Sequence, residues 1–385
     1  MTSQTHANIT ARLLCRSALS AVLRLRSVAL ALAISAANAD AQLPERRLPA
    51  KPDAVAEEPF SDLRSVRELA DGRLLVLDMR DQTIQLVDLD KGTAEAVARR
   101  GKGPGEYAQA TALVPWPGDS TAVVDAETGR LLLVDPRGKA GRVVTEFPNG
   151  VDARPGAVSV ADGRGLLYLG VMASVEKAGT FVMPDSQALM RLDPSTGRMA
   201  RIATIALVRS EVKTSSSGGK LTGVQIFRIP FSVGDEWDVA PDGRVAIARR
   251  APYRLDQIMA DGRVVRGPEV SVPTLEVTEA DRKEFISGML NATPARIAAI
   301  PWPKTRPPFP ARAVIALPGG ETWVRRNQTA GAKTTIYDVF GAVGRPVTKL
   351  VLPADRRVIA ASARWIYVAK TDGDGLQYLE RYSRI

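Results

Sequence analysis

The eight residues Asp71-Gly72-Arg73-Leu74-Leu75-Val76-Leu77-Asp78 join a tight turn to a short apolar run that ends on an acid. An Asp-Gly pair favours the backbone of a β-turn, and an apolar run bounded by polar residues is typical of a buried strand. A similar phrase of turn, strand and polar residue begins five more times, at Gly118, Asp162, Asp242, Gly319 and Ala363. The chain therefore repeats one unit six times.

Most of these units continue with a second strand and a second turn. Thr83–Asp88 precedes Lys91-Gly92, and Leu131–Asp135 precedes Arg137-Gly138. Successive units begin roughly 45 residues apart, and two longer gaps of about 80 residues contain insertions. We place these insertions at about residues 206–235 and 268–307.

Strands joined by such turns form antiparallel meanders, and the unit length suits a propeller blade. With 31 Gly and 26 Pro in 385 residues, the chain has too many helix breakers for a mainly helical protein. The sequence therefore predicts an all-β fold: a six-bladed β-propeller of four-stranded antiparallel blades. A two-sheet β-sandwich is the alternative.

The second insertion contains a helix signal. Thr278 begins the stretch Thr278-Glu279-Ala280-Asp281, which resembles an N-cap, and Phe285, Ile286, Met289 and Leu290 fall on one helical face. We predict a short helical insertion that packs on the side of the propeller. A lid over the central channel is the alternative.

The N-terminus has the pattern of an export signal. Four arginines precede the short apolar run Ser27–Ser35, and small residues allow cleavage after Ala39 or Ala41. The run is shorter than the ~20 residues that span a bilayer, so we expect no transmembrane anchor after cleavage and an exported protein, periplasmic or extracellular. The predicted division is a signal peptide, an N-terminal lead segment and the propeller, at 1–41, 42–60 and 61–385.

The single His6 and the single Cys15 both lie in this predicted signal peptide. The rest of the chain therefore has no Ser-His-Asp or Cys-His arrangement and no Cys/His zinc site. The net charge is +10, but no basic run is interleaved with aromatic residues, so nucleic acid is not a predicted partner. We predict no catalytic residue and no metal site, and these absences favour a non-enzymatic protein without deciding the question.

The stretch Gly101-Lys102-Gly103-Pro104-Gly105-Glu106-Tyr107 resembles the G-x-G-P-G-E-aromatic signature of NHL-like six-bladed propellers. The C-terminal stretch from Pro308 to Tyr382 is similar to the end of exported bacterial members of that class. The resemblance implies the fold and export, but no established activity. Glycine and proline shape such a loop, with Tyr107 expected to pack between blades and Glu106 to accept backbone hydrogen bonds. A ligand-contacting loop is the alternative.

The seventh position after the start of each repeated turn defines a set that we call the strand-end positions. In a four-stranded blade these positions should surround one face of the propeller, and they are Asp78, Asp125, Leu169, Arg249, Arg326 and Lys370. Acids fall in the first two blades and bases in the last three, which predicts a two-sided channel mouth for an anionic small molecule. The alternative is that these groups form interblade salt bridges or satisfy backbone groups. The candidate ligand-binding residues are Asp78, Lys102, Glu106, Tyr107, Asp125, Arg249, Arg326 and Lys370.

We therefore expect an exported binding or interaction module, whose partner is a small anionic ligand or an envelope or extracellular protein. One alternative is a carboxylate- or calcium-dependent hydrolase, lactonase or lyase, because six-bladed relatives of the gluconolactonase and strictosidine synthase types use acids and, in some, calcium. Asp78, Asp125 and Glu106 could supply some oxygens for calcium, but no asparagine ends a repeated strand. No cofactor is predicted, and calcium is left open. A structural envelope scaffold is the third alternative.

Overall fold

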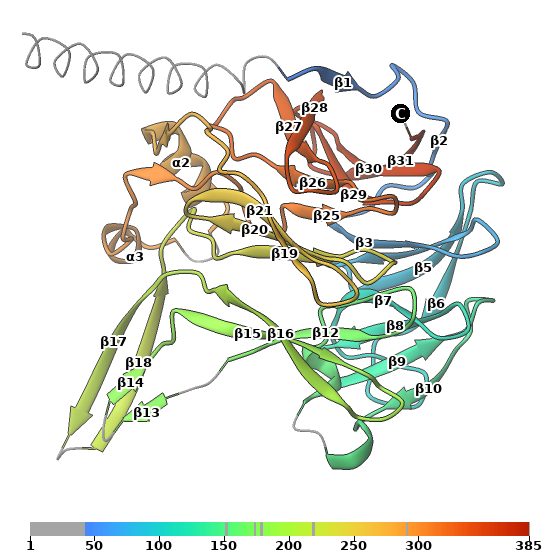
Figure 1. Cartoon of the computed structure of the whole chain (residues 1–385), viewed down its shortest axis with the longest axis horizontal. Helices are drawn as coiled ribbons and strands as arrows, with labels where there is room; N and C mark the ends of the chain where they lie inside the picture. The colour runs from blue at the N-terminus through green and yellow to red at the C-terminus, as the bar shows by residue number, and fades with distance from the viewer. Residues whose placement is uncertain are drawn as a thin grey trace, which may run out of the picture.

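The structure is a computed structural model that describes residues 43–150, 153–172, 175–177, 180–217, 220–289 and 292–384. The predicted signal peptide lies outside the described residues. Six antiparallel sheets surround a common centre (Figure 1), which confirms the six-bladed β-propeller.

Each blade runs from an inner strand at the centre to an outer strand at the rim. Blade 1 consists of β3 (Leu63–Glu68), β4 (Leu74–Asp78), β5 (Thr83–Asp88) and β6 (Thr93–Ala98). Blade 2 consists of β7 (Ala110–Trp116), β8 (Ser120–Asp125), β9 (Arg130–Val134) and β10 (Ala140–Val144). Blade 3 consists of β11 (Val160–Ala161), β12 (Leu167–Val171), β15 (Ser186–Leu192) and β16 (Met199–Ala206).

The second half of the ring repeats this arrangement. Blade 4 consists of β19 (Glu236–Val239), β20 (Val245–Arg250), β21 (Tyr253–Ile258) and β22 (Val264–Arg266). Blade 5 consists of β25 (Val314–Ala316), β26 (Thr322–Arg325), β27 (Thr334–Phe340) and β28 (Pro346–Pro353). Blade 6 takes β29 (Arg356–Ala361), β30 (Trp365–Thr371) and β31 (Gln377–Ser383) from the C-terminus.

The N-terminal segment closes the ring. β2 (Ala54–Val55) pairs antiparallel with β31 and becomes the outer strand of blade 6. β1 (Glu45–Arg47) pairs parallel with β28 and adds a fifth strand to blade 5. The stretch 42–60, set apart as a lead segment in the sequence analysis, thus contains both of these strands.

The hydrophobic core is divided into six clusters of buried residues, and each cluster lies between two neighbouring blades. Successive side chains of a strand point to opposite faces of its sheet, so β4 contributes to two clusters. Leu74 and Val76 pack against blade 6, while Leu75 and Leu77 pack against blade 2. This two-sided burial explains why the repeated strand is continuously apolar.

The insertions lie beside the ring in Figure 1. β17 (Ser210–Ser217) and β18 (Lys220–Arg228) form a long hairpin in the first insertion. A shorter hairpin, β13 (Val175–Lys177) with β14 (Thr180–Val182), interrupts blade 3 and was not predicted. Two 3₁₀ turns, Pro148–Gly150 and Pro155–Ala157, precede blade 3.

The predicted helix is α2 (Glu279–Ser287), and α3 (Pro294–Ala298) follows it between β23 (Leu275–Glu276) and β24 (Thr305–Arg306). Thr278 and Asp281 form a capping box at the start of α2. The Phe285 ring contacts the rings of Phe231 and Trp302 at centroid distances of 5.6 and 5.5 Å. Helix α2 therefore packs against the segment between β18 and β19 and the segment between α3 and β24. Leu290 lies outside the described residues. No helix in the described part of the chain is long and apolar enough to cross a membrane.

Candidate functional site

The two acidic strand-end positions are buried under the loops that enter their blades. The Asp78 carboxylate accepts hydrogen bonds from the backbone N–H groups of Ser61, Asp62, Arg80 and Asp81. These bonds hold together the start of β3 and the turn after β4. The oxygens of Asp78 are therefore committed to the backbone of blade 1.

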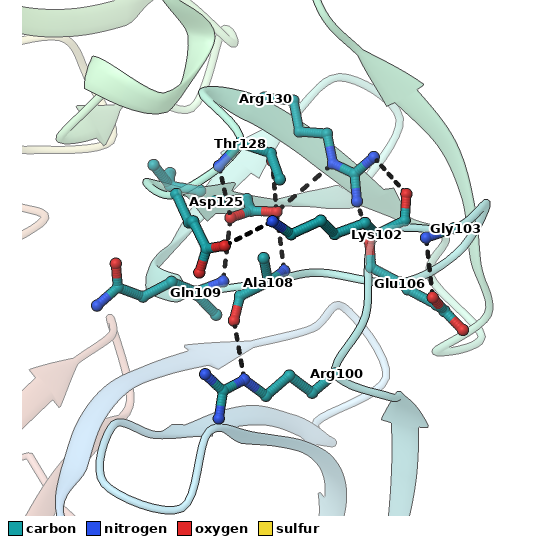
Figure 2. Close-up of polar contacts among 12 residues, drawn as sticks. Arg100, Lys102, Gly103, Glu106, Ala108, Gln109, Asp125, Thr128 and Arg130 are labelled. Carbon is teal, nitrogen blue, oxygen red and sulfur yellow. Dashed lines mark hydrogen bonds and ion pairs between the residues drawn. The ribbon is translucent and has the colours of Figure 1, made fainter.

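Asp125 plays the same part in blade 2 (Figure 2). It accepts hydrogen bonds from the N–H groups of Ala108 and Gln109 at 3.0 and 3.1 Å and from the Thr128 hydroxyl at 2.6 Å. Arg130 lies 3.5 Å from the carboxylate. Although burial opposes the charged form, the bonds from Thr128 and the backbone lower the pKa of Asp125.

The G-x-G-P-G-E loop is fastened by the same group of residues (Figure 2). Arg130 donates hydrogen bonds to the carbonyl oxygens of Lys102 and Glu106, at 3.2 and 2.9 Å. The Glu106 carboxylate accepts a hydrogen bond from the N–H of Gly103 at 2.8 Å. This bond and the hydrogen bond from Arg99 lower the pKa of Glu106. A Cβ on Gly101 would lie 2.0 Å from the same carboxylate, so a larger residue there would displace the Glu106 side chain from its present position.

The other two candidates in this loop differ in burial. Tyr107 is buried between blades 1 and 2 and donates a hydrogen bond from its hydroxyl to the carbonyl oxygen of Gln82 at 2.6 Å. The Lys102 ammonium is exposed and lies 2.9 Å from Glu127. The observed contacts of the loop thus join neighbouring strands and turns of blades 1 and 2.

The basic strand-end positions are paired as well. Arg249 lies 2.8 Å from Asp235 and 2.9 Å from Asp256. Arg326 lies 2.7 Å from the buried Asp338. The exception is Lys370, which is partly exposed and has no ion pair with a described residue.

A cavity of about 1280 Å³ follows the inner strands and forms the central channel of the propeller. Its wall is formed by β3, β7, β11, β19, β25 and β29 and by the loops at their ends. Among its described lining residues there is none of the candidates named from the sequence. The channel is therefore a second site, distinct from the strand-end positions.

Five arginines line this channel; Arg67 is paired with Asp119, and Arg312 lies just before β25. The other three come from three blades, and we call them the arginine cluster: Arg64, Arg325 and Arg357. Arg357 donates a hydrogen bond to the carbonyl oxygen of Leu63 at 3.2 Å, and Arg325 approaches the carbonyl oxygen of Ala311 at 3.5 Å. None of the three forms an ion pair with a described residue. Burial first, and then the nearby charge of Arg325, lower the pKa of Arg357.

Two carboxyl groups of β19 face the arginine cluster from blade 4. Glu236 and Asp238 are two residues apart and both line the channel. Their carboxylates accept backbone N–H groups of blade 5, from Arg312 at 2.6 Å and from Ala316 at 2.8 Å. They therefore join the inner edges of blades 4 and 5.

The channel makes both of these carboxyl groups weak acids. Burial raises the pKa of Glu236 to about 7; the nearby charge of Arg325 opposes this shift, and that of Asp235 adds to it. Burial also raises the pKa of Asp238 to about 6, against the effect of its hydrogen bonds to Ala316 and Val239. A cavity that combines arginines with carboxyl groups of perturbed pKa is a functional-site candidate on physical grounds.

None of these channel residues belongs to the candidates named from the sequence. The repeated phrase selects Arg326, whereas its neighbour Arg325 is the one that lines the channel, since adjacent strand residues point to opposite faces. Glu236 begins a strand of only four residues directly after an insertion, where the repeated phrase has not yet begun. An alternation analysis of Trp323–Arg326 could have separated the two arginines.

Among the described residues, no group of three or more His, Cys, Asp or Glu side chains is arranged to hold a metal ion. Asp78, Asp125 and Glu106, which the calcium alternative invoked, accept hydrogen bonds from N–H or hydroxyl groups. No donor set for calcium is therefore assembled from them.

The sequence matches no family model, and it matches no curated protein. Its fold is similar to that of a DUF4221 member from Bacteroides vulgatus, with a TM-score of 0.50 and 10% identity over 89% of this chain and 99% of the other. It is also similar to a gluconolactonase from Xanthomonas campestris, with a TM-score of 0.44 and 12% identity over 86% and 97%. A calcium-binding regucalcin from Agrobacterium tumefaciens has a TM-score of 0.43 and 12% identity, over 89% of this chain and 97% of the other.

At this level of identity the comparisons concern the fold alone. The six-bladed β-propeller itself is shown by the sheets of this chain, and the DUF4221 member is similar to it in fold. The NHL-like resemblance of the Gly101–Tyr107 loop and export both stay predictions from the sequence.

Proposed function

We propose that this chain is an exported propeller that binds a small oxyanion, a carboxylate or a phosphate, in its central channel. The observation that carries the proposal is the arginine cluster: Arg64, Arg325 and Arg357 converge from three blades without a carboxylate partner among the described residues. Partly buried guanidinium groups bind oxyanions through charge-assisted hydrogen bonds. An anion bound between guanidinium groups reduces the repulsion among them and so stabilises the folded protein.

The test is thermal and urea unfolding of the purified protein with sulfate, phosphate and succinate, and with glucose as an uncharged control. A ligand at a hundredfold its Kd adds about 2.7 kcal/mol to the free energy of unfolding. We expect at least one of the three anions to stabilise the protein and glucose to have no effect. Absence of binding by all three anions would contradict the proposal.

Variants locate the bound anion. Arg325→Gln and Arg357→Gln should each weaken binding about tenfold, equivalent to ~1.4 kcal/mol. Arg263→Gln is the matched control, because it removes the same charge from an exposed turn whose ion pair spans 3.8 Å. Equal affinities in all three variants would contradict a site at the arginine cluster.

The strand-end positions remain a second proposed site for the same anion, and Lys370 offers the cleanest test of it. Unlike Arg249 and Arg326, Lys370 has no ion pair with a described residue, so it can be changed without breaking one. Loss of anion binding in Lys370→Gln, with binding retained in Arg325→Gln, would favour the strand-end positions over the channel.

A further inference from the structure

Glu236 presents one carboxyl oxygen to the central channel. Its Oε2 accepts the N–H of Arg312 at 2.6 Å, which fixes the orientation of the group. Its Oε1 has no hydrogen bond with a described residue and does not belong to the buried side-chain atoms that lack a partner. Because Glu236 lines the channel, this oxygen is open to a ligand there.

The charges around Glu236 come from every element packed against it. Arg325 of β26 attracts the charged form, while Asp235, directly before β19, disfavours it. Asp235 is itself paired with Arg249 of β20. Asp238 follows two residues later on the same strand, and Arg312, just before β25, lines the channel beside it. Arg357 of β29 and Arg64 of β3 line the same channel, together with the charged residues Arg67, Glu68, Asp119 and Asp162.

A carboxylate at this place would repel the anion that the arginine cluster attracts. The burial of Glu236 removes this conflict, because it raises the pKa to about 7 and leaves the group protonated in a large part of the molecules at neutral pH. A protonated carboxyl group is a hydrogen-bond donor as well as an acceptor. The same side chain then adds to anion binding and no longer opposes it.

We propose that the Glu236 carboxylic acid donates a hydrogen bond from Oε1 to the oxyanion held by the arginine cluster, so that each bound anion brings a proton with it. The proposal rests on the proposed function and names the ligand class more narrowly. With Glu236 neutral, the three arginines and Asp238, which is mostly ionised at neutral pH with a pKa of about 6, leave two positive charges for an oxyanion that carries two negative charges. The proton comes from solvent and returns to it on release.

The probe is sulfate, which keeps its two charges between about pH 5.5 and about pH 8.5. We expect the Kd of the wild-type protein to rise as Glu236 ionises, by up to tenfold per pH unit above its pKa, because linkage of one proton sets this limit. Calorimetry near pH 7 in two buffers of different ionisation enthalpy should show net proton uptake on binding. A pH-independent Kd with no proton uptake overturns the inference, and this measurement needs no variant.

Glu236→Gln replaces the acid with a permanently neutral donor. We expect this variant to bind sulfate within about threefold of the wild-type affinity at low pH and to lose the pH dependence. Asp238→Asn is the matched control, since Asp238 also titrates in the channel but both its oxygens accept backbone N–H groups. Loss of the pH dependence in Asp238→Asn, or its persistence in Glu236→Gln, overturns the assignment to Glu236.

Failure of the anion site and failure of the Glu236 hydrogen bond give different results. If sulfate does not bind at any pH, the proposed function fails and the inference falls with it. If sulfate binds and Arg325→Gln weakens it, but binding takes up no proton, the anion site stands and only the role of Glu236 is overturned.

Discussion

Blades 1 and 2 and blades 4 and 5 secure the same place in the fold with opposite charges. In blades 1 and 2 the strand-end position is an aspartate, Asp78 or Asp125, and it accepts N–H groups of the neighbouring loops. In blades 4 and 5 it is Arg249 or Arg326, and each arginine is paired with an aspartate of the third strand. Both solutions bury polar groups with their partners in place.

Either sign of charge is therefore accommodated at this position when a partner compensates it. The charged residues at the strand-end positions of blades 1, 2, 4 and 5 report how these blades are fastened. The arginine cluster of the channel is different, because Arg64, Arg325 and Arg357 have no ion-pair partner among the described residues. Uncompensated charge marks the better candidate for ligand binding.

Among the substitutions at the strand-end positions, Asp125→Ala is expected to cause the largest loss in the free energy of unfolding. The substitution leaves two backbone N–H groups and the Thr128 hydroxyl without their acceptor, and Arg130 without its counter-charge. We expect a loss of about 4 kcal/mol in the free energy of unfolding, as for other broken buried pairs. Urea unfolding at neutral pH measures it.

The control for Asp125→Ala is Asp261→Ala, at an exposed turn whose ion pair spans 3.8 Å. Its cost should stay within about 0.5 kcal/mol, the range of ordinary surface substitutions. A cost below about 1 kcal/mol for Asp125→Ala would show that the carboxylate is not needed to fasten the blade.

The adjacent residues Arg325 and Arg326 are expected to differ in their effects on stability and on anion binding. Arg326→Met leaves the buried Asp338 with the Tyr253 hydroxyl at 2.8 Å as a remaining partner, and we expect a cost of about 3 kcal/mol. Arg325→Met removes a charge that disfavours the ionised form of Arg357, and should change stability by less than about 0.5 kcal/mol while weakening anion binding. Parallel unfolding and binding measurements on the two variants test this exchange of roles. Similar stabilities of the two variants would remove the distinction.

The fold could be predicted because one local phrase recurs in every blade. The turn at Asp71-Gly72 and the two-sided burial of Leu74–Leu77 come from interactions that repeat at each blade interface, so they leave a periodic mark in the sequence. The closing strand β2 leaves no such mark. It consists of two residues, and its pairing with β31 joins opposite ends of the chain.

The channel could not be predicted in the same way. Its wall is formed by inner strands that are short, such as β11 with two residues and β25 with three, and these carry no periodic signal. The pKa of Glu236 is raised by burial and lowered by Arg325, which lies almost ninety residues away in the chain. Only the three-dimensional structure brings these groups together.

A pH-dependent effect separates the buried Asp125 from the partly buried Asp238, whose pKa values are shifted in opposite directions. Hydrogen bonds hold the pKa of Asp125 low despite its burial, whereas burial raises the pKa of Asp238 to about 6 from 3.8. Between about pH 4 and pH 6 the unfolded chain has lost the Asp238 proton while the folded chain keeps it. The contribution of Asp238 to stability therefore falls as the pH rises through this window.

Asp238→Asn removes this titration, so its stability relative to the wild-type protein should improve by about 2 kcal/mol from pH 4.5 to pH 6.5. The matched variant Asp125→Asn should show no such gain, because a carboxylate of lowered pKa stabilises the fold above its unfolded pKa and loses that contribution only as the pH falls. Urea unfolding at four pH values measures both differences. A flat difference for Asp238→Asn would mean that the channel solvates this carboxylate. Asp238 would then be charged already near pH 5, and at that pH the channel would attract anions less strongly than the raised pKa implies.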